Sequence, residues 1–146
     1  MLSKNKKAHF DYEILETYEA GIELLGLEVK SVKSGNAHLK GARVIIRGGE
    51  AFVVGVTIPP YQQNNTPKGY EPDRTRRLLL HKKELKYLAG KSEERGLTLI
   101  PIRLYNKGPK VKLEFGVARG KKKYDKRETI KKRETQRSMR RELKNF

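Results

Sequence analysis

The chain has 146 residues, and its 34 Lys and Arg residues outnumber 17 Asp and Glu residues, which gives a formal net charge of +17. Such a length accommodates one domain with an extension, and the absence of cysteine excludes a disulfide framework and a thiolate metal site. There is neither a secretory core nor a run of roughly 20 apolar residues that would suit a membrane helix, so we expect a cytoplasmic protein. The charge favours a phosphate-rich partner over a membrane surface, since no strongly amphipathic helix or lipidation motif is present.

The first part of the chain predicts a strand followed by a short helix. Apolar residues alternate over residues 9–16, which is the period of a half-buried strand, and residues 22–24 extend or restart this strand after a break at Gly21. Residues 25–33 carry apolar side chains at helical spacing, and Gly35 is placed to cap the end of that helix.

A hairpin and a long loop are expected next. The β-branched runs 43–47 and 50–58 are joined by Gly48-Gly49, a pair that suits a tight turn with positive φ at both positions. Residues 61–73 are rich in Asn, Gly and Pro and show no periodicity, so they predict an exposed loop of the kind that often carries function.

The rest of the domain predicts a strand at 76–80, a helix at 82–95 and a second hairpin. The hairpin strands are 97–105 and 110–118, joined by a turn at 106–109. Five or six strands without βαβ alternation favour a mainly β fold. We expect a closed antiparallel barrel of the oligonucleotide-binding type with two or three flanking helices.

Residues 119–146 predict a basic C-terminal tail that is separate from the domain at residues 1–118. The tail has 13 Lys or Arg against 4 Asp or Glu, which leaves a net +8 on the domain. Large apolar residues are too few to offset the cost of ordering its backbone, so we expect the free tail to be disordered. Met139, Leu143 and Phe146 share one helical stripe, which indicates that the tail becomes helical when bound.

Binding chemistry is more abundant than catalytic chemistry. The three histidines lack metal-ligand spacing and no glycine-rich phosphate loop is present, so we expect no enzyme activity, metal or cofactor. A two-metal nuclease site remains an alternative if the fold brings together Asp11, Asp73 and Asp125. Four basic runs indicate nucleic-acid binding. They are residues 4–7, Lys30 with Lys33, residues 74–77 and residues 120–127.

Six short motifs resemble the small protein B (SmpB) family of SsrA-binding proteins, in the family's order and over nearly the whole chain. They are Asn5-Lys6-Lys7-Ala8, residues 20–24, residues 26–31, residues 73–81, residues 116–122 and Asp125-Lys126-Arg127. The resemblance implies an RNA-binding adaptor that binds the tRNA-like domain of transfer-messenger RNA (SsrA RNA). It also implies delivery of that RNA to stalled ribosomes in trans-translation, with a tail that enters the empty message channel and becomes helical there.

The resemblance implies two groups of contact residues. Those for the tRNA-like domain are Asn5, Lys6, Lys7, Glu28, Lys30, Arg74 and Arg76. Those for the ribosome near its decoding centre are Lys121, Lys122, Lys123, Tyr124, Asp125, Lys126 and Arg127. Phosphate repels the Glu28 carboxylate, so its expected role is to accept hydrogen bonds from base amino groups or to orient Lys30. Tyr124 stands where some relatives have histidine, and either ring can stack on a base.

Two other binding functions fit the same composition. One is a structural ribosomal protein, and the other is a general single-stranded RNA-binding protein of the oligonucleotide-binding fold. Neither a heptad nor an apolar stripe argues for assembly, so we expect a monomer.

Overall fold

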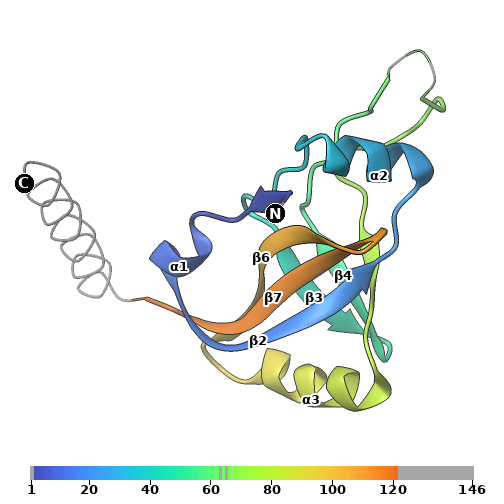
Figure 1. The fold of residues 1–146 in the computed structure, drawn as a ribbon. Helices are drawn as coiled ribbons and strands as arrows, with labels where there is room; N and C mark the ends of the chain where they lie inside the picture. The colour runs from blue at the N-terminus through green and yellow to red at the C-terminus, as the bar shows by residue number, and fades with distance from the viewer. Residues whose placement is uncertain (1, 63, 65, 122–146) are drawn as a thin grey trace, which may run out of the picture.

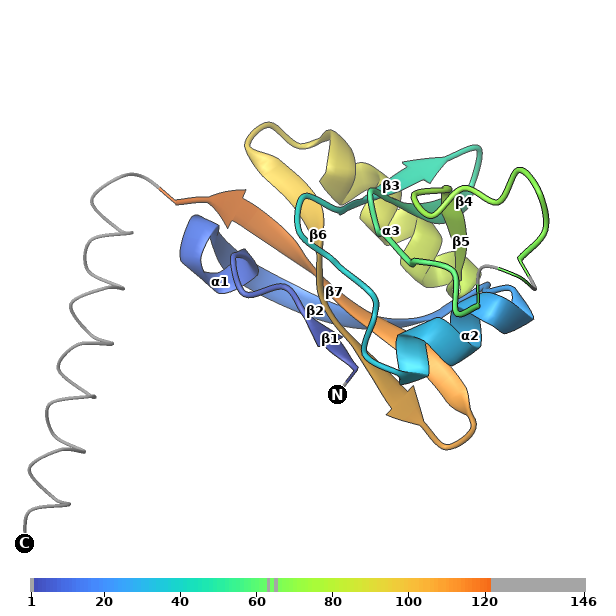
Figure 2. The same cartoon turned by 90° about the horizontal axis from the view of Figure 1, so that it is seen from above.

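The computed structural model describes residues 2–62, 64 and 66–121 (Figures 1 and 2). The tail is expected to be disordered when free and helical when bound. Its residues beyond 121 lie outside the described part of the chain. In chain order the elements are β1 (Ser3–Lys4), α1 (Ala8–Asp11), β2 (Tyr12–Ile22), α2 (Gly26–Lys33), β3 (Arg43–Arg47), β4 (Glu50–Val54), β5 (Arg76–Leu79), α3 (Lys82–Glu93), β6 (Leu97–Lys107) and β7 (Lys110–Gly120).

The strands form one antiparallel sheet in the order β1-β6-β3-β4-β5-β2-β7. β6 also pairs with β7 along its length, so the last strand in this order lies against the second. Figure 1 shows α2 and α3 at opposite ends of the sheet. The prediction of a mainly β, antiparallel fold with a few helices is therefore confirmed.

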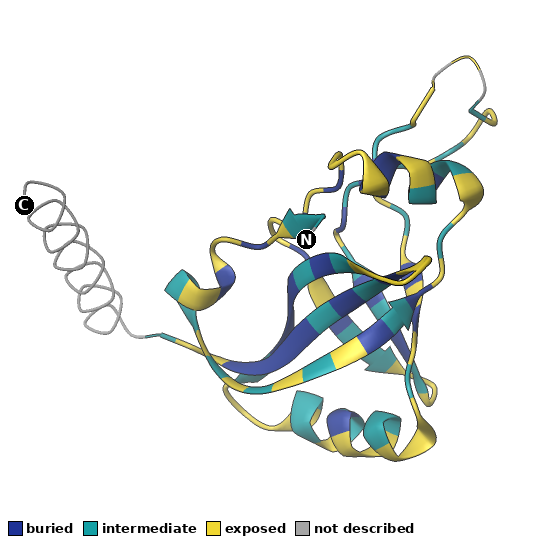
Figure 3. Cartoon of the chain, viewed as in Figure 1, coloured by how far each residue is buried: buried dark blue, intermediate teal, exposed yellow. Residues whose placement is uncertain are grey.

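The core lies on the inner side of the strands, where buried residues gather (Figure 3). On β7 the four apolar residues that alternate in the sequence are all buried, and they are Val111, Leu113, Phe115 and Val117. Each of the two longer helices adds a fully buried side chain to the same cluster, Val32 from α2 and Leu88 from α3. Burying a side chain of this size contributes about 1.5–3 kcal/mol, which holds both helices against the sheet.

Both predicted hairpins are present. Gly48 and Gly49 have φ values of 60° and 74°, as the two-residue turn between β3 and β4 requires. β4 ends four residues before its predicted end because the following segment leaves the sheet, and Thr57 pairs with His38 instead. The turn between β6 and β7 is tighter than predicted, since Lys107 pairs with Lys110. Backbone pairing does not depend on the polarity of exposed side chains, so the polar residues Asn106 and Lys107 extend β6 beyond its predicted end.

The predicted strand at residues 9–16 is wrong at its beginning, because α1 occupies Ala8–Asp11 and β2 starts at Tyr12. The N–H of Ala8 donates to the carbonyl of Asn5 at 3.1 Å, and the Ala8 side chain is buried. Alternation over so few residues does not distinguish a strand from one helical turn. β2 then continues through Gly21 without a break, and the two-residue strand β1 was not predicted.

Gly116 on β7 lies where the backbone of β2 approaches most closely. A Cβ at this position would lie 2.8 Å from the carbonyl oxygen of Glu16 and 2.9 Å from Cγ2 of Ile14. We therefore expect Gly116→Ala to lower the free energy of unfolding by about 1–3 kcal/mol, measured by urea denaturation. Gly90→Ala in α3 is the control, because a Cβ there meets nothing within 4 Å and Ala favours helix by about 1 kcal/mol. Equal effects of the two substitutions would contradict this packing.

None of the helices in the described range combines the length and the hydropathy that crossing a bilayer requires.

Candidate nucleic-acid interface

Glu28 on α2 is the centre of a buried group of polar side chains. Its carboxylate accepts hydrogen bonds from Arg74 and Arg76, and the hydroxyl of Tyr70 lies within hydrogen-bonding distance. We call these four residues the Glu28 cluster. Glu28 is fully buried, and its Oε1 also accepts the backbone N–H of Leu25 at 2.8 Å. A glutamate at the third position of a helix reaches back in this way, so the local sequence of α2 places the carboxylate.

Arg76 on β5 is fully buried, and several acceptors surround its guanidinium. Its Nε and Nη2 donate to Oε2 of Glu28 at 2.8 and 2.5 Å, respectively. Nη1 donates to the carbonyl of Val56 at 2.7 Å, and Nη2 also donates to the carbonyl of Pro72 at 2.9 Å. These bonds join β5, α2 and the connection between β4 and β5. They compensate the desolvation that burial of an ion pair requires.

Arg74 carries the charge of the cluster to the surface. Its side chain is 30% exposed, and its Nε donates to Oε2 of Glu28 at 3.1 Å. Burial raises the pKa of Glu28, but hydrogen bonds from Arg74, the N–H of Leu25 and Arg76 outweigh burial, so the pKa lies below its ordinary value. The cluster therefore holds two guanidinium cations and one carboxylate anion. The surplus positive charge faces solvent through Arg74.

Tyr70 was not identified from the sequence, although it anchors the predicted loop at residues 61–73. Its hydroxyl lies 2.8 Å from the carbonyl of Ile58 and 3.1 Å from Oε2 of Glu28. Burial raises the pKa of Tyr70, and the neighbouring carboxylate raises it further. The loop is thus fixed to α2 at its C-terminal end. The available signal was a single aromatic residue late in a polar, proline-containing segment.

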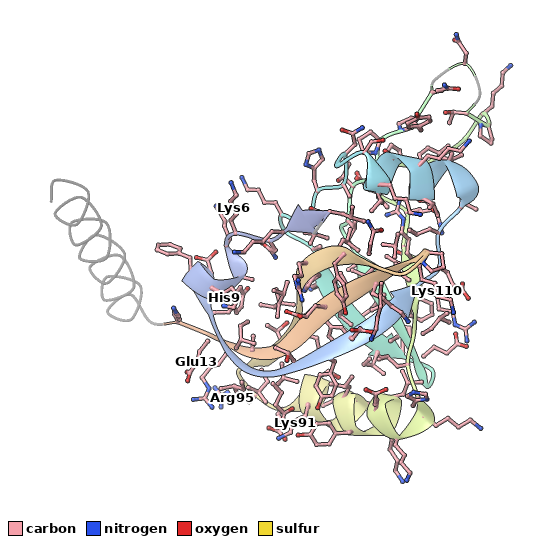
Figure 4. The ribbon with its side chains drawn as sticks, in the orientation of Figure 1. Lys6, His9, Glu13, Lys91, Arg95 and Lys110 are labelled. Carbon is pink, nitrogen blue, oxygen red and sulfur yellow. The ribbon has the colours of Figure 1, made fainter. Side chains whose placement is uncertain are left out.

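The predicted contact residues near the N-terminus are also divided between buried and exposed positions. Asn5 is buried, and its side-chain amide donates to the carbonyl of Pro101 at 3.0 Å. Lys6 and Lys7 follow it and are exposed, as Figure 4 shows for Lys6. Lys30 on α2 is exposed as well. The accessible members of the predicted set are therefore Lys6, Lys7, Lys30 and Arg74, and the buried members are Asn5, Glu28 and Arg76.

The accessible cations lie toward one end of the sheet. The hydroxyl of Ser3 on β1 donates to the carbonyl of Ala37 at 2.8 Å, which joins β1 to the segment that follows α2. Figures 1 and 2 show β1 between α1 and α2, at the end of the sheet opposite α3. Lys7 also lines a hollow of about 380 Å³ together with Lys40 and Arg43, so further cations border this end.

A second exposed feature lies beside β5. The side chain of Leu79 is 50% exposed, whereas that of Leu78 is 2% exposed. Leu79 borders a hollow of about 520 Å³, whose other lining residues include Thr17, Glu19, His81 and Lys112. The sequence did not predict this feature, because the second of three consecutive leucines cannot be distinguished from its neighbours before the strand register is known.

Comparisons with known proteins identify the relatives of this chain. The model of the SmpB protein family matches residues 2–145. The chain belongs to the SmpB family. The SsrA-binding protein of Gloeothece citriformis (strain PCC 7424) is 49% identical over 146 residues, which cover 100% of this chain and 94% of that protein. The SsrA-binding protein of Microcystis aeruginosa (strain NIES-843 / IAM M-2473) is 49% identical over 144 residues, or 99% of this chain and 94% of that protein.

A solved structure is also similar to this SmpB family member. A chain of the structure described as "tmRNA-SmpB: a journey to the center of the bacterial ribosome" is 42% identical and superposes with a TM-score of 0.69. The match covers 88% of this chain and 93% of that chain. The family predicted from the sequence motifs is therefore confirmed.

Of the tail residues predicted to contact the ribosome, the structure of this SmpB family member describes Lys121. Its N–H donates to the carbonyl of Asp11, and its Nζ donates to the carbonyl of His9, each at 2.8 Å. The chain that follows β7 is therefore attached to α1 at this point. The other predicted residues lie outside the described part of the chain, and they are Lys122, Lys123, Tyr124, Asp125, Lys126 and Arg127.

The nuclease alternative finds no support in the described residues, which contain no group of three His, Cys, Asp or Glu side chains suited to a metal ion. Asp73 instead accepts a hydrogen bond from the hydroxyl of Thr57 at 2.6 Å. Asp125, the third residue of that alternative, lies outside the described range.

Proposed function

We propose that this chain is an RNA-binding adaptor of trans-translation. It binds the tRNA-like domain of transfer-messenger RNA and delivers that RNA to stalled ribosomes, without a catalytic step of its own. The observation that carries the proposal is the match to SsrA-binding proteins over the whole length of the chain. In this mechanism the folded body and the tRNA-like RNA together imitate a tRNA.

The body is, by this proposal, a closed barrel of the oligonucleotide-binding type. The strand pairings support closure, because β6 pairs with β1, β3 and β7 and each of the other strands from β2 to β7 pairs with two neighbours. Barrels of this type bind nucleic acid with a strand face and the adjoining loops. β5 and the loop before it supply such a face here, since they carry Arg74 and Leu79.

The seven predicted body residues then take two kinds of role. Lys6, Lys7, Lys30 and Arg74 bind phosphates. Asn5 fixes the turn that presents the first two lysines, and Glu28 with Arg76 holds the guanidinium of Arg74 in place. Four phosphate contacts correspond to a salt dependence of binding with a log–log slope of roughly −3.

The tail forms the second part of the adaptor. Residues 122–146 carry 11 Lys or Arg against 4 Asp or Glu, so they compete for ribosomal RNA phosphates that bound message would otherwise screen. Contacts near the decoding centre fall on the segment from Lys121 to Arg127. The protein would thus recognise a stalled ribosome by its empty message channel.

The function is tested by RNA capture with the full chain. Immobilised protein is expected to retain transfer-messenger RNA and to lose most of that retention when the tRNA-like end of the RNA is deleted. Equal retention of both RNAs would instead indicate a general RNA-binding protein. Persistence on ribosomal subunits through high-salt washes would indicate a structural ribosomal protein, because a few phosphate contacts weaken strongly as salt rises.

Removing the charges of Lys6 and Lys7 is expected to weaken RNA binding without unfolding the body. Both side chains are exposed, so the double variant Lys6→Gln/Lys7→Gln should keep its melting temperature. Its affinity for transfer-messenger RNA should fall roughly tenfold at low salt, measured by filter binding. The control is Lys91→Gln/Arg95→Gln, which removes the same charge near the end of α3, away from this surface (Figure 4). Equal weakening by both pairs would show that net charge alone governs binding.

A further inference from the structure

The first turns of α3 carry three exposed lysines. Lys82 and Lys83 are the first two residues of the helix, and Lys86 follows one turn later. None of the three lies within ion-pair distance of a carboxylate among the described residues. The carboxylate of Glu84 in the same turn is directed back toward the N–H of His81, at 3.2 Å. The helix therefore begins with three cations and one anion.

This arrangement is electrostatically unfavourable for the helix. The N-terminal end of a helix carries partial positive charge, so cations belong near the opposite end. Lys86 also lies three and four residues after Lys83 and Lys82, spacings at which like charges repel one another. α3 thus has a local electrostatic cost that a bound anion would relieve. By contrast, Lys91 lies in the last turn and pairs with Glu94 at 3.3 Å.

The lysines continue a surface that already belongs to the proposed interface. Arg74 precedes β5, the exposed Leu79 ends it, and α3 starts three residues later. Extended chain advances about 3.3 Å per residue, so Arg74 and Lys82 are separated by up to roughly 25 Å. That length spans several successive phosphates of one RNA strand. Figure 1 shows the first turn of α3 on the opposite side of the molecule from α1, to which Lys121 is attached.

We propose that Lys82, Lys83 and Lys86 bind backbone phosphates of transfer-messenger RNA, on the strand that also contacts Arg74. The inference rests on the proposed function and extends its interface along β5 onto α3. The partner is this RNA rather than ribosomal RNA, because the surface continues from Arg74 along β5 to the exposed Leu79 and the start of α3. Lysine ammonium groups bind phosphates without reading bases, so these contacts add affinity and not sequence preference.

Two charge-matched variants of the full chain test the proposal. Lys82→Gln/Lys86→Gln and Lys91→Gln/Arg95→Gln each remove two cations four residues apart, one pair near each end of α3. The first variant is expected to bind transfer-messenger RNA roughly tenfold more weakly, with a log–log salt slope smaller in magnitude by about 1.4–1.8. It should also melt at a higher temperature than the unsubstituted chain. The second variant should bind normally and melt at a slightly lower temperature, because cations stabilise that end of a helix.

Each other outcome overturns the inference in a distinguishable way. Unchanged affinity and salt slope in Lys82→Gln/Lys86→Gln, with normal binding by the unsubstituted chain, would reject the α3 surface and leave the proposed function intact. Equal weakening by both variants would assign the effect to net charge. Normal RNA binding with weakened ribosome binding would assign these lysines to ribosomal RNA. Failure of the unsubstituted chain to bind transfer-messenger RNA would reject the proposed function together with the inference.

Discussion

Glu28→Gln is expected to lower the free energy of unfolding by about 3–5 kcal/mol, a large share of the stability of a small domain. The substitution keeps the size of the side chain but leaves the buried guanidinium of Arg76 without a counter-charge. It also weakens the hold on Arg74 and on Tyr70, which anchors the loop after β4. Urea denaturation followed by far-ultraviolet circular dichroism measures the change.

Glu23→Gln is the matched control, because it removes an equivalent carboxylate from an exposed ion pair. Glu23 lies 3.4 Å from Arg77, and both side chains are about half exposed, at 51% and 45%. Such pairs contribute little, so the expected change is within about 0.5 kcal/mol. If Glu28→Gln and Glu23→Gln destabilised the protein equally, the Glu28 cluster would not be the element that holds α2, β5 and the connection between β4 and β5 together.

The same cluster predicts a pH dependence of stability. The pKa of Glu28 is lower in the folded protein than its ordinary value of 4.5, so the unfolded chain takes up the proton first as pH falls. The stabilisation is fully present above the unfolded pKa and is lost as pH falls through the folded pKa. Denaturation midpoints of the unsubstituted chain should therefore decrease below about pH 5 more steeply than those of Glu28→Gln. Parallel curves would show that another group dominates acid unfolding.

Local patterns in the sequence predicted the parts of the fold whose determinants are local. The helix α2 and the hairpin at Gly48-Gly49 follow from residues within a few positions of one another. The inward face of β7 follows from strict alternation along one strand. α1 was missed because one helical turn and a short alternating strand share the same few apolar positions.

The burial and pairing of Glu28 and Arg76 could be recognised only from the tertiary structure. The family resemblance indicated both residues as RNA contacts, and charged residues are ordinarily exposed, so their burial was not predicted. Their pairing joins positions 48 residues apart in the chain, a separation that no local pattern describes. Arg74 lies two positions before Arg76 and outside β5, which begins at Arg76, and its side chain is 30% exposed. The resemblance thus identified three of the four residues of the Glu28 cluster, and the structure separates the partly exposed Arg74 from the buried Glu28 and Arg76.

Truncation after Lys121 is expected to abolish tagging of incomplete proteins on stalled ribosomes while preserving the fold. The predicted boundary after residue 118 lies inside β7, whose last residue, Gly120, pairs with Tyr12. The N–H of Lys121 also donates to the carbonyl of Asp11, so a stop after this residue keeps the described contacts of the body. The truncated protein should therefore keep its melting temperature.

The truncation separates the two RNA-binding parts because it removes a net charge of +7 and none of the body residues proposed to bind the tRNA-like domain. Filter binding should detect transfer-messenger RNA binding at moderate salt, and a reconstituted translation assay with a message that lacks a stop codon should detect no tagging. A full-length chain in which residues 122–146 are scrambled is the control for charge alone. If the scrambled tail restored tagging, charge would suffice, and the specific roles of Tyr124 and Asp125 would be rejected. Tagging by the truncated protein would reject the proposed role of the tail, since the body would then engage the decoding centre by itself.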